Sequence, residues 1–209
     1  MNKLAVFDFD STLMDGETIE IIANEVGLQD KVAEITKQAM EGHIDFFDSL
    51  SYRVALLKGI KESRVNDICR NLPYMNGAKD TIKALKQMGY TVVCFSGGFK
   101  NATEYAKDVL GYDADFSNIL HVNNGILTGK VGGEMMFSTS KGDMLVKLQK
   151  LLNVDYHNTI AIGDGANDLS MFKYAKTKVA FCAKECLAQA ATHVVYNKDL
   201  TEILKFICL

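Results

Sequence analysis

The sequence predicts an α/β fold, with a Rossmann-like parallel sheet at its core and a helical cap domain inserted after the first strand. Short apolar strands alternate along the chain with amphipathic helices, which is typical of a parallel sheet with helical crossovers. The segment 16–71 has a helical pattern throughout, and it is much longer than a normal crossover between two strands. The 209 residues are enough for one sizeable core and a small inserted module.

Several short segments have the composition of buried parallel strands. Each is rich in β-branched or aromatic residues and is bounded by Gly, Asp, Asn or Lys, a pattern expected where helices cover both faces of a sheet. The predicted strands are Leu4–Phe7, Tyr90–Phe95, Thr159–Ile162, Lys178–Phe181 and His193–Tyr196.

The predicted cap comprises residues 16–71, in which apolar residues such as Phe46, Leu50 and Val54 recur at helical spacing. An insert directly after the first strand lies over the carboxyl edge of the sheet, where ligands of α/β proteins bind. Pro73 is the only proline, and it marks the return to the core. We therefore assign residues 1–15 and 72–209 to the core.

A β-hairpin is predicted within Phe116–Phe137, where apolar and polar residues alternate. Asn124-Gly125 has the composition of a tight hairpin turn, and Gly132-Gly133 supplies a second turn signal. We expect the hairpin to form a short flap near the functional site.

Composition narrows the class of protein. The chain is 48% hydrophobic and 23% charged, which is typical of a globular domain. Its net charge of −3, without a stripe of Lys and Arg, argues against nucleic acid and membrane surfaces as partners. No signal peptide or membrane span is evident. The five cysteines have neither metal-binding nor redox spacing. We expect a cytoplasmic protein that binds a small molecule, and the sequence specifies no protein partner.

Two carboxylates, Asp8 and Asp10, follow the first predicted strand in Phe7-Asp8-Phe9-Asp10-Ser11-Thr12. One carboxylate can attack phosphorus, while a second carboxylic acid protonates the departing alkoxide and later deprotonates the attacking water. For such a pair on its own, a strand that ends in a solvated aspartate turn is the better explanation, so the motif needs support from elsewhere in the chain.

A small-residue segment and a lysine provide that support. Ser96-Gly97-Gly98 separates a predicted strand from a helical pattern, and such a turn can bind phosphate through backbone N–H groups and the Ser96 hydroxyl. Lys141 begins another helix and would offset charge on phosphoryl oxygens, although most lysines are simply solvated.

A Gly-rich acidic turn, with Asp164, Asn167 and Asp168, follows a third strand. Carboxylates combined with water and phosphate suit Mg²⁺, and the turn lacks the alternating acidic ligands of a calcium loop. Because the carboxyl ends of parallel strands meet at one edge of a sheet, these motifs are expected to converge.

The four motifs, in this order, resemble those of the haloacid-dehalogenase superfamily of phosphohydrolases. Asp8-Phe9-Asp10-Ser11-Thr12 matches its Asp-x-Asp-x-Thr motif, Ser96 its second motif, Lys141 its third and Gly163–Asp168 its acidic fourth. The resemblance implies Asp8 as nucleophile, Asp10 as acid and base, and Mg²⁺ held by Asp8, Asp10 and Asp164. Asn167 and Asp168 would help to position phosphate, Lys141 or water.

Over essentially its whole length the chain also resembles the phosphoserine phosphatase family, whose members complete serine biosynthesis. That resemblance implies that Glu17 holds the substrate ammonium, that Arg53 holds its carboxylate, and that Met40 and Phe46 pack over the substrate. Arg suits a carboxylate because it can form two parallel hydrogen bonds. An ordinary amphipathic cap would also contain such residues.

Two other functions stay open on the sequence alone. The same core could act on another small phosphomonoester, for example phosphohomoserine. A phosphoaspartate signalling module would share Asp8, a Ser/Thr and a lysine, but a placed acid and base such as Asp10 would shorten the life of its phosphorylated state.

Overall fold

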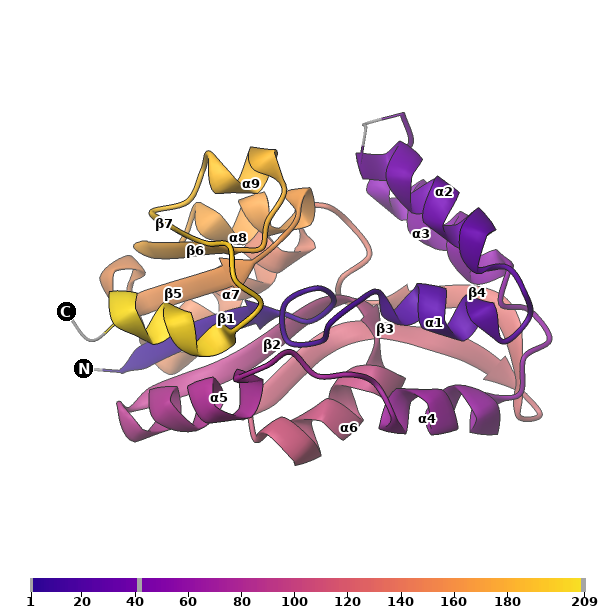
Figure 1. Ribbon diagram of the computed structural model, residues 1–209, viewed down its shortest axis with the longest axis horizontal. Helices are drawn as coiled ribbons and strands as arrows, with labels where there is room; N and C mark the ends of the chain where they lie inside the picture. Colours follow the sequence, from indigo (N-terminus) through magenta and orange to yellow (C-terminus); the bar gives the residue numbers. More distant parts are fainter. Residues whose placement is uncertain (1, 41–42, 208–209) are drawn as a thin grey trace.

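A computed structural model describes residues 2–40 and 43–207, without the side chain of Met40 (Figure 1). Within these residues seven strands form one sheet in the order β4-β3-β2-β1-β5-β6-β7. Neighbouring strands are parallel except for the antiparallel pair β3 and β4. The α/β class is confirmed. The strands are β1 (Lys3–Asp8), β2 (Tyr90–Phe99), β3 (Ala114–Asn123), β4 (Ile126–Gly133), β5 (Thr159–Gly163), β6 (Thr177–Phe181) and β7 (His193–Val195).

Strand β1 lies at the centre of the sheet and is buried on both faces. Leu4 and Val6 pack into one hydrophobic cluster, whereas Ala5 and Phe7 pack into the other, as the two-residue period of a strand requires. Because β1 pairs with both β2 and β5, its last residue, Asp8, emerges in the middle of the carboxyl edge. The topology therefore gives Asp8 a neighbouring strand on each side, β2 and β5.

Helices cover both faces of this sheet (Figure 1). The core helices are α5 (Ala78–Gln87), α6 (Lys100–Leu110), α7 (Ser140–Leu152), α8 (Leu169–Phe172) and α9 (Glu185–Ala188), with 3₁₀ turns at Tyr156–Asn158, Ala166–Asp168 and Leu200–Phe206. None of the helices in residues 2–40 and 43–207 is long and apolar enough to cross a membrane. The cysteines that the structure describes, Cys69, Cys94, Cys182 and Cys186, are free thiols.

The segment between β1 and α5 contributes α1 (Thr18–Asn24), α2 (Gln29–Met40), α3 (Phe46–Ala55) and α4 (Glu62–Arg70). In Figure 1, α2 and α3 rise above the sheet at its β4 edge, where α3 contacts β4, while α4 lies beside α6. One hydrophobic cluster runs from cap residues such as Leu50 and Val65 into core residues such as Phe99 and Ala102. The division of the chain at residues 16 and 71 into cap and core stays a prediction.

The predicted hairpin is present as β3 and β4. Asn124 and Gly125 both have positive φ, 50° and 74°, which is the conformation of a tight hairpin turn. The hairpin is not a detached flap, because β3 pairs with β2 and extends the main sheet. Gly132-Gly133 ends β4 and forms no second hairpin. The Gly59 N–H donates to the Leu127 carbonyl (2.9 Å), so β4 also supports the cap segment that follows α3.

Candidate active site

The carboxylate of Asp8 shares a buried cation with Asp168. The Nζ atom of Lys141, in the first turn of α7, lies 2.6 Å from Oδ1 of Asp8 and 2.6 Å from Oδ1 of Asp168. The exposed fraction of these side chains is only 3% for Lys141, 6% for Asp8 and 0% for Asp168. Burial opposes the charge of Lys141, but Asp168 and Asp8 outweigh it and raise the pKa of the lysine. The structure thus places Lys141 against Asp8.

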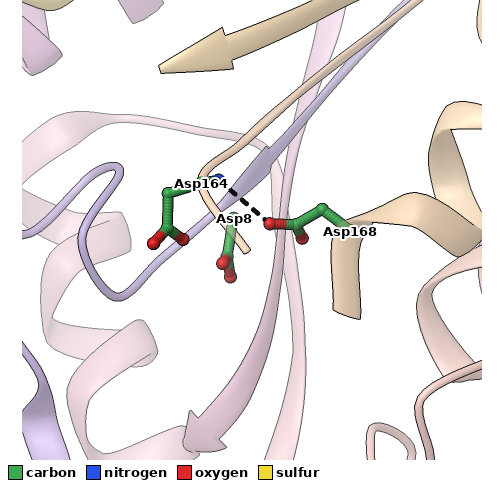
Figure 2. A group of neighbouring side chains, drawn as sticks. All are labelled: Asp8, Asp164 and Asp168. Carbon is green, nitrogen blue, oxygen red and sulfur yellow. Dashed lines mark hydrogen bonds between the residues drawn. The ribbon is translucent and has the colours of Figure 1, made fainter. Parts of the chain in front are cut away.

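The second oxygen of Asp168 holds the acidic turn after β5. It accepts the N–H groups of Asp164 and Gly165, both at 3.0 Å, and Figure 2 shows the first of these bonds. A Cβ atom on Gly163 would lie 2.3 Å from this oxygen, so the close approach requires glycine. Both oxygens of Asp168 are therefore engaged within the protein.

Asp8, Asp164 and Asp168 could together hold a metal ion, because their nearest ligand oxygens lie within 4.8 Å of one another. In Figure 2 the carboxylates of Asp8 and Asp164 point to the same side, while Asp168 approaches from the other. Burial, and after it repulsion from Asp168, raises the pKa of Asp164 to about 7 and the pKa of Asp8 well above its usual range. A buried group of like charges with two available carboxylates suits a divalent cation with oxygen ligands.

Asp10 is held by the beginning of the cap. Its Oδ1 atom accepts the Thr18 N–H (2.8 Å) and the Thr18 hydroxyl. Burial raises the pKa of Asp10, and the hydrogen bonds from Thr18 oppose that rise only in part. A raised pKa favours the protonated carboxyl, as a general acid requires.

Ser96-Gly97-Gly98 differs from its prediction as a loop between a strand and a helix. Strand β2 continues to Phe99 and bulges: Phe95 pairs with Phe116 but Phe99 pairs with Asn118, so three residues of β2 face one of β3. The Asn118 side chain bridges the gap in the ladder by donating to the Gly97 carbonyl (3.0 Å). Ser96 is fully buried, and its hydroxyl oxygen accepts the Gly98 N–H (2.9 Å).

A cavity of about 640 Å³ lies between these motifs and the cap. Its walls include predicted site residues from both parts of the chain: Asp8, Asp10, Glu17, Phe46, Arg53, Gly97, Asp164 and Asn167. Ser96, Lys141 and Asp168 are buried and do not line it. The side chain of Met40, also predicted to contact substrate, lies outside the described part of the chain.

The cap wall of the cavity carries the carboxylates of Glu17 and Asp45 and the guanidinium of Arg53. Glu17 accepts the Ser11 hydroxyl (2.9 Å), and burial, followed by repulsion from Asp10, raises its pKa to about 8. Arg53 donates from Nε to the Ser49 carbonyl, at 3.2 Å. Burial lowers the pKa of Arg53, and Glu17 and Asp10 counteract that effect. A ligand in this cavity meets carboxylates and a guanidinium together.

Several lining residues were not predicted from the sequence. Thr36, Lys184 and Cys186 contact the cavity although they belong to no motif. The Lys184 N–H donates to the Asp164 carbonyl (2.9 Å), and this long-range contact brings its segment to the site. The sequence carries no signal for Lys184 and Cys186. Thr36 lies on the buried face of α2, one turn after Val32, and a single polar residue at helical spacing among buried positions was the only signal for it in the sequence.

Comparison with known proteins identifies the family to which the chain belongs. The family model for haloacid dehalogenase-like hydrolases matches residues 2–176. The chain belongs to the haloacid dehalogenase-like hydrolases. This hydrolase is 60% identical to the phosphoserine phosphatase of Wolinella succinogenes, over 97% of its own chain and 98% of that relative. It is 47% identical to the phosphoserine phosphatase of Methanocaldococcus jannaschii, over 98% and 97% of the two chains.

Solved structures similar to this hydrolase include two forms of phosphoserine phosphatase. One is a phospho-aspartyl intermediate analogue, with a TM-score of 0.94, 46% identity and coverage of 98% of each chain. Another is a substrate-bound complex, also with a TM-score of 0.94 and 46% identity, covering 99% of this chain and 98% of that one.

We expect Asp168→Asn to lower the free energy of unfolding by about 3 kcal/mol, because breaking a buried ion pair leaves the lysine with less compensation. The amide would also turn a donor toward Lys141 or toward the two backbone N–H groups. Urea denaturation measures the loss.

The matched control is Asp67→Asn, which breaks a half-exposed pair with Arg70 (3.3 Å) and should cost less than about 1 kcal/mol. Equal losses in the two variants would contradict a structural role for Asp168.

Proposed function

We propose that this hydrolase removes phosphate from O-phospho-L-serine, giving L-serine and phosphate through an aspartyl-phosphate on Asp8. The observation that carries the proposal is the cavity that has Asp8 and Asp10 on its core wall and Glu17 and Arg53 on its cap wall. Phosphoryl chemistry and recognition of an amino acid zwitterion are thereby combined. The names of the close relatives support the same substrate.

The reaction takes place in two displacements. A carboxylate oxygen of Asp8 attacks phosphorus, the bond from phosphorus to the serine oxygen breaks, and Asp10 gives that oxygen its proton. In the second half Asp10, now ionised, takes a proton from water as the water oxygen attacks phosphorus. Phosphate leaves and Asp8 is regenerated with Asp10 protonated.

Charge on the transferring phosphoryl group is stabilised from behind the cavity wall. Lys141 lies 2.6 Å from Asp8 and can share its N–H groups with a phosphoryl oxygen. The bulge of β2 adds the Gly97 N–H and the Ser96 hydroxyl. The Ser96 oxygen accepts the Gly98 N–H, so the proton of the hydroxyl points away from Gly98 and can be donated to a phosphoryl oxygen. Asn167, on the cavity wall, orients phosphate.

Mg²⁺ fits the donor set, with Asp8, Asp164 and the main-chain carbonyl of Asp10 as its ligands. When bound it would supply positive charge beside the phosphoryl oxygens and offset the repulsion among the buried carboxylates. Asp168 would keep Asp164 and Lys141 in place, because both of its oxygens are already engaged.

Substrate recognition belongs to the cap. Glu17 holds the ammonium group and Arg53 the carboxylate, while Phe46 packs over Gly97 and covers the substrate. L-serine as product would put the reaction at the end of serine biosynthesis. We propose a cytoplasmic enzyme that acts on this small molecule, without nucleic acid or a membrane as partner.

Asp8→Asn should lower turnover of phosphoserine by about a thousandfold or more, because the amide is not a nucleophile. Phosphate release, with Mg²⁺ and with a chelator, measures both the nucleophile and the metal requirement. The matched control is Asp15→Asn, an exposed neighbour that pairs with Lys198 and should retain activity. Robust turnover by Asp8→Asn would refute the scheme, and release of a single equivalent by the parent protein would indicate a signalling module.

Arg53→Ala should lower kcat/KM for phosphoserine by about a hundredfold and that for O-phosphoethanolamine, which lacks the carboxylate, by less than about threefold. The comparison separates recognition of the zwitterion from phosphoryl chemistry. Arg70→Ala, a half-exposed arginine of the same cap, is the control. Equal losses for both esters would argue for a different substrate.

Binding of phosphoserine at pH 7 should release a proton from Glu17. Its pKa of about 8 keeps the group protonated before substrate binds, and the substrate ammonium favours the ionised form. Affinity should therefore rise as pH rises toward 8. Calorimetry on Asp8→Asn in buffers of different ionisation enthalpy measures the proton, and adding Glu17→Gln should remove it. An unchanged proton release would exclude Glu17 as its source.

A further inference from the structure

Arg53 is a buried cation with an unusual set of partners. Its side chain is 8% exposed, yet none of the ion pairs within the described residues includes it. Its hydrogen bonds go to neutral oxygens: Nε donates to the Ser49 carbonyl and Nη1 to the Thr36 hydroxyl, both at 3.2 Å. The guanidinium is therefore fixed in place without a carboxylate in direct contact, and its other N–H groups are available to a ligand.

The Thr36 hydroxyl is oriented by its own helix. Thr36 lies within α2 and is 8% exposed, and its Oγ1 donates to the Val32 carbonyl one turn earlier, at 3.0 Å. A hydroxyl has a single proton, so the lone pairs of Oγ1 must face the guanidinium. Val32 is fully buried, which anchors this short chain of bonds in the cap interior.

Two helices thus position one side chain. Ser49 lies on α3 one turn before Arg53, and the bond from Arg53 Nε to the Ser49 carbonyl aligns the guanidinium along α3. Thr36 comes from the neighbouring helix α2 and restricts rotation of the guanidinium about that line. Thr36 and Arg53 both line the cavity, so this orientation decides how the N–H groups of Arg53 face a ligand there.

We propose that Thr36 is a positioning residue for substrate selection, which holds the Arg53 guanidinium in the orientation that receives the carboxylate of phosphoserine. The inference rests on the proposed function. A neutral acceptor is suited to this task, since a carboxylate at the same position would compete with the substrate for the cation. In this proposal Thr36 acts only through Arg53 and has no part in the chemical step.

The test compares Thr36→Val and Thr36→Ala, which lack the hydroxyl, with Thr36→Ser, which keeps it. Loss of the hydroxyl should raise KM for phosphoserine about tenfold and leave kcat within about twofold, while KM for O-phosphoethanolamine stays unchanged. Thr36→Ser should restore the parent KM. In the Arg53→Ala background, Thr36→Val should have no further effect.

The matched control is Thr81→Val, a buried threonine of α5 outside the cavity, which should leave both KM values unchanged. Thr36→Ala, with high helix propensity, serves if Thr36→Val folds poorly. Equal KM increases for the two esters, an unchanged KM for phosphoserine, or additivity with Arg53→Ala would overturn the proposal. If the parent protein does not prefer phosphoserine to O-phosphoethanolamine, the proposed substrate is wrong and the inference falls with it.

Discussion

The contact on which the site depends is the buried bridge from Asp8 through Lys141 to Asp168. Three charged side chains with almost no exposure are stable only when each has close partners of opposite sign or hydrogen-bond donors. Lys141 provides the charge, and the N–H groups of Asp164 and Gly165 complete Asp168. A strand end, a helix start and a turn from separate parts of the chain are tied together in this way.

Much of this arrangement follows from topology, and that part could be predicted. Asp8 ends β1 and Asp164 directly follows β5, so the expectation that parallel strands meet at one edge was enough to bring them together. The position of Lys141 could not be derived, because a helix that follows a hairpin can begin at many places. The bulge at Ser96–Gly98 was not predicted, because it depends on contacts between distant parts of the chain. These are the pairing of β2 with β3 and the Asn118 side chain, 21 residues from Gly97.

The cap shows the same limit. Helical spacing indicated which residues face inward, but it does not indicate which helix packs against which. The bond from Arg53 to Thr36 crosses 17 residues and depends on the pairing of α2 with α3. Glu17 was assigned through the resemblance to the phosphoserine phosphatase family, whereas Thr18, the next residue, was missed. Its role as a donor to Asp10 is evident only in the folded chain, where residue 18 lies within hydrogen-bond distance of residue 10.

The two buried cations of this site are held by opposite means, and the difference follows their tasks. Lys141 is bound by two carboxylates, which keep it charged and fixed in place. At that position it can interact with a phosphoryl group, which carries more than one negative charge. Arg53 is held by a carbonyl and a hydroxyl, while Glu17, Asp10 and Glu20 support its charge from beyond direct contact. The single carboxylate of the substrate could not displace a protein carboxylate already bound to Arg53. The arginine that selects the substrate is therefore left without a permanent anionic partner. The neutral acceptors therefore matter as much to selectivity as the arginine itself.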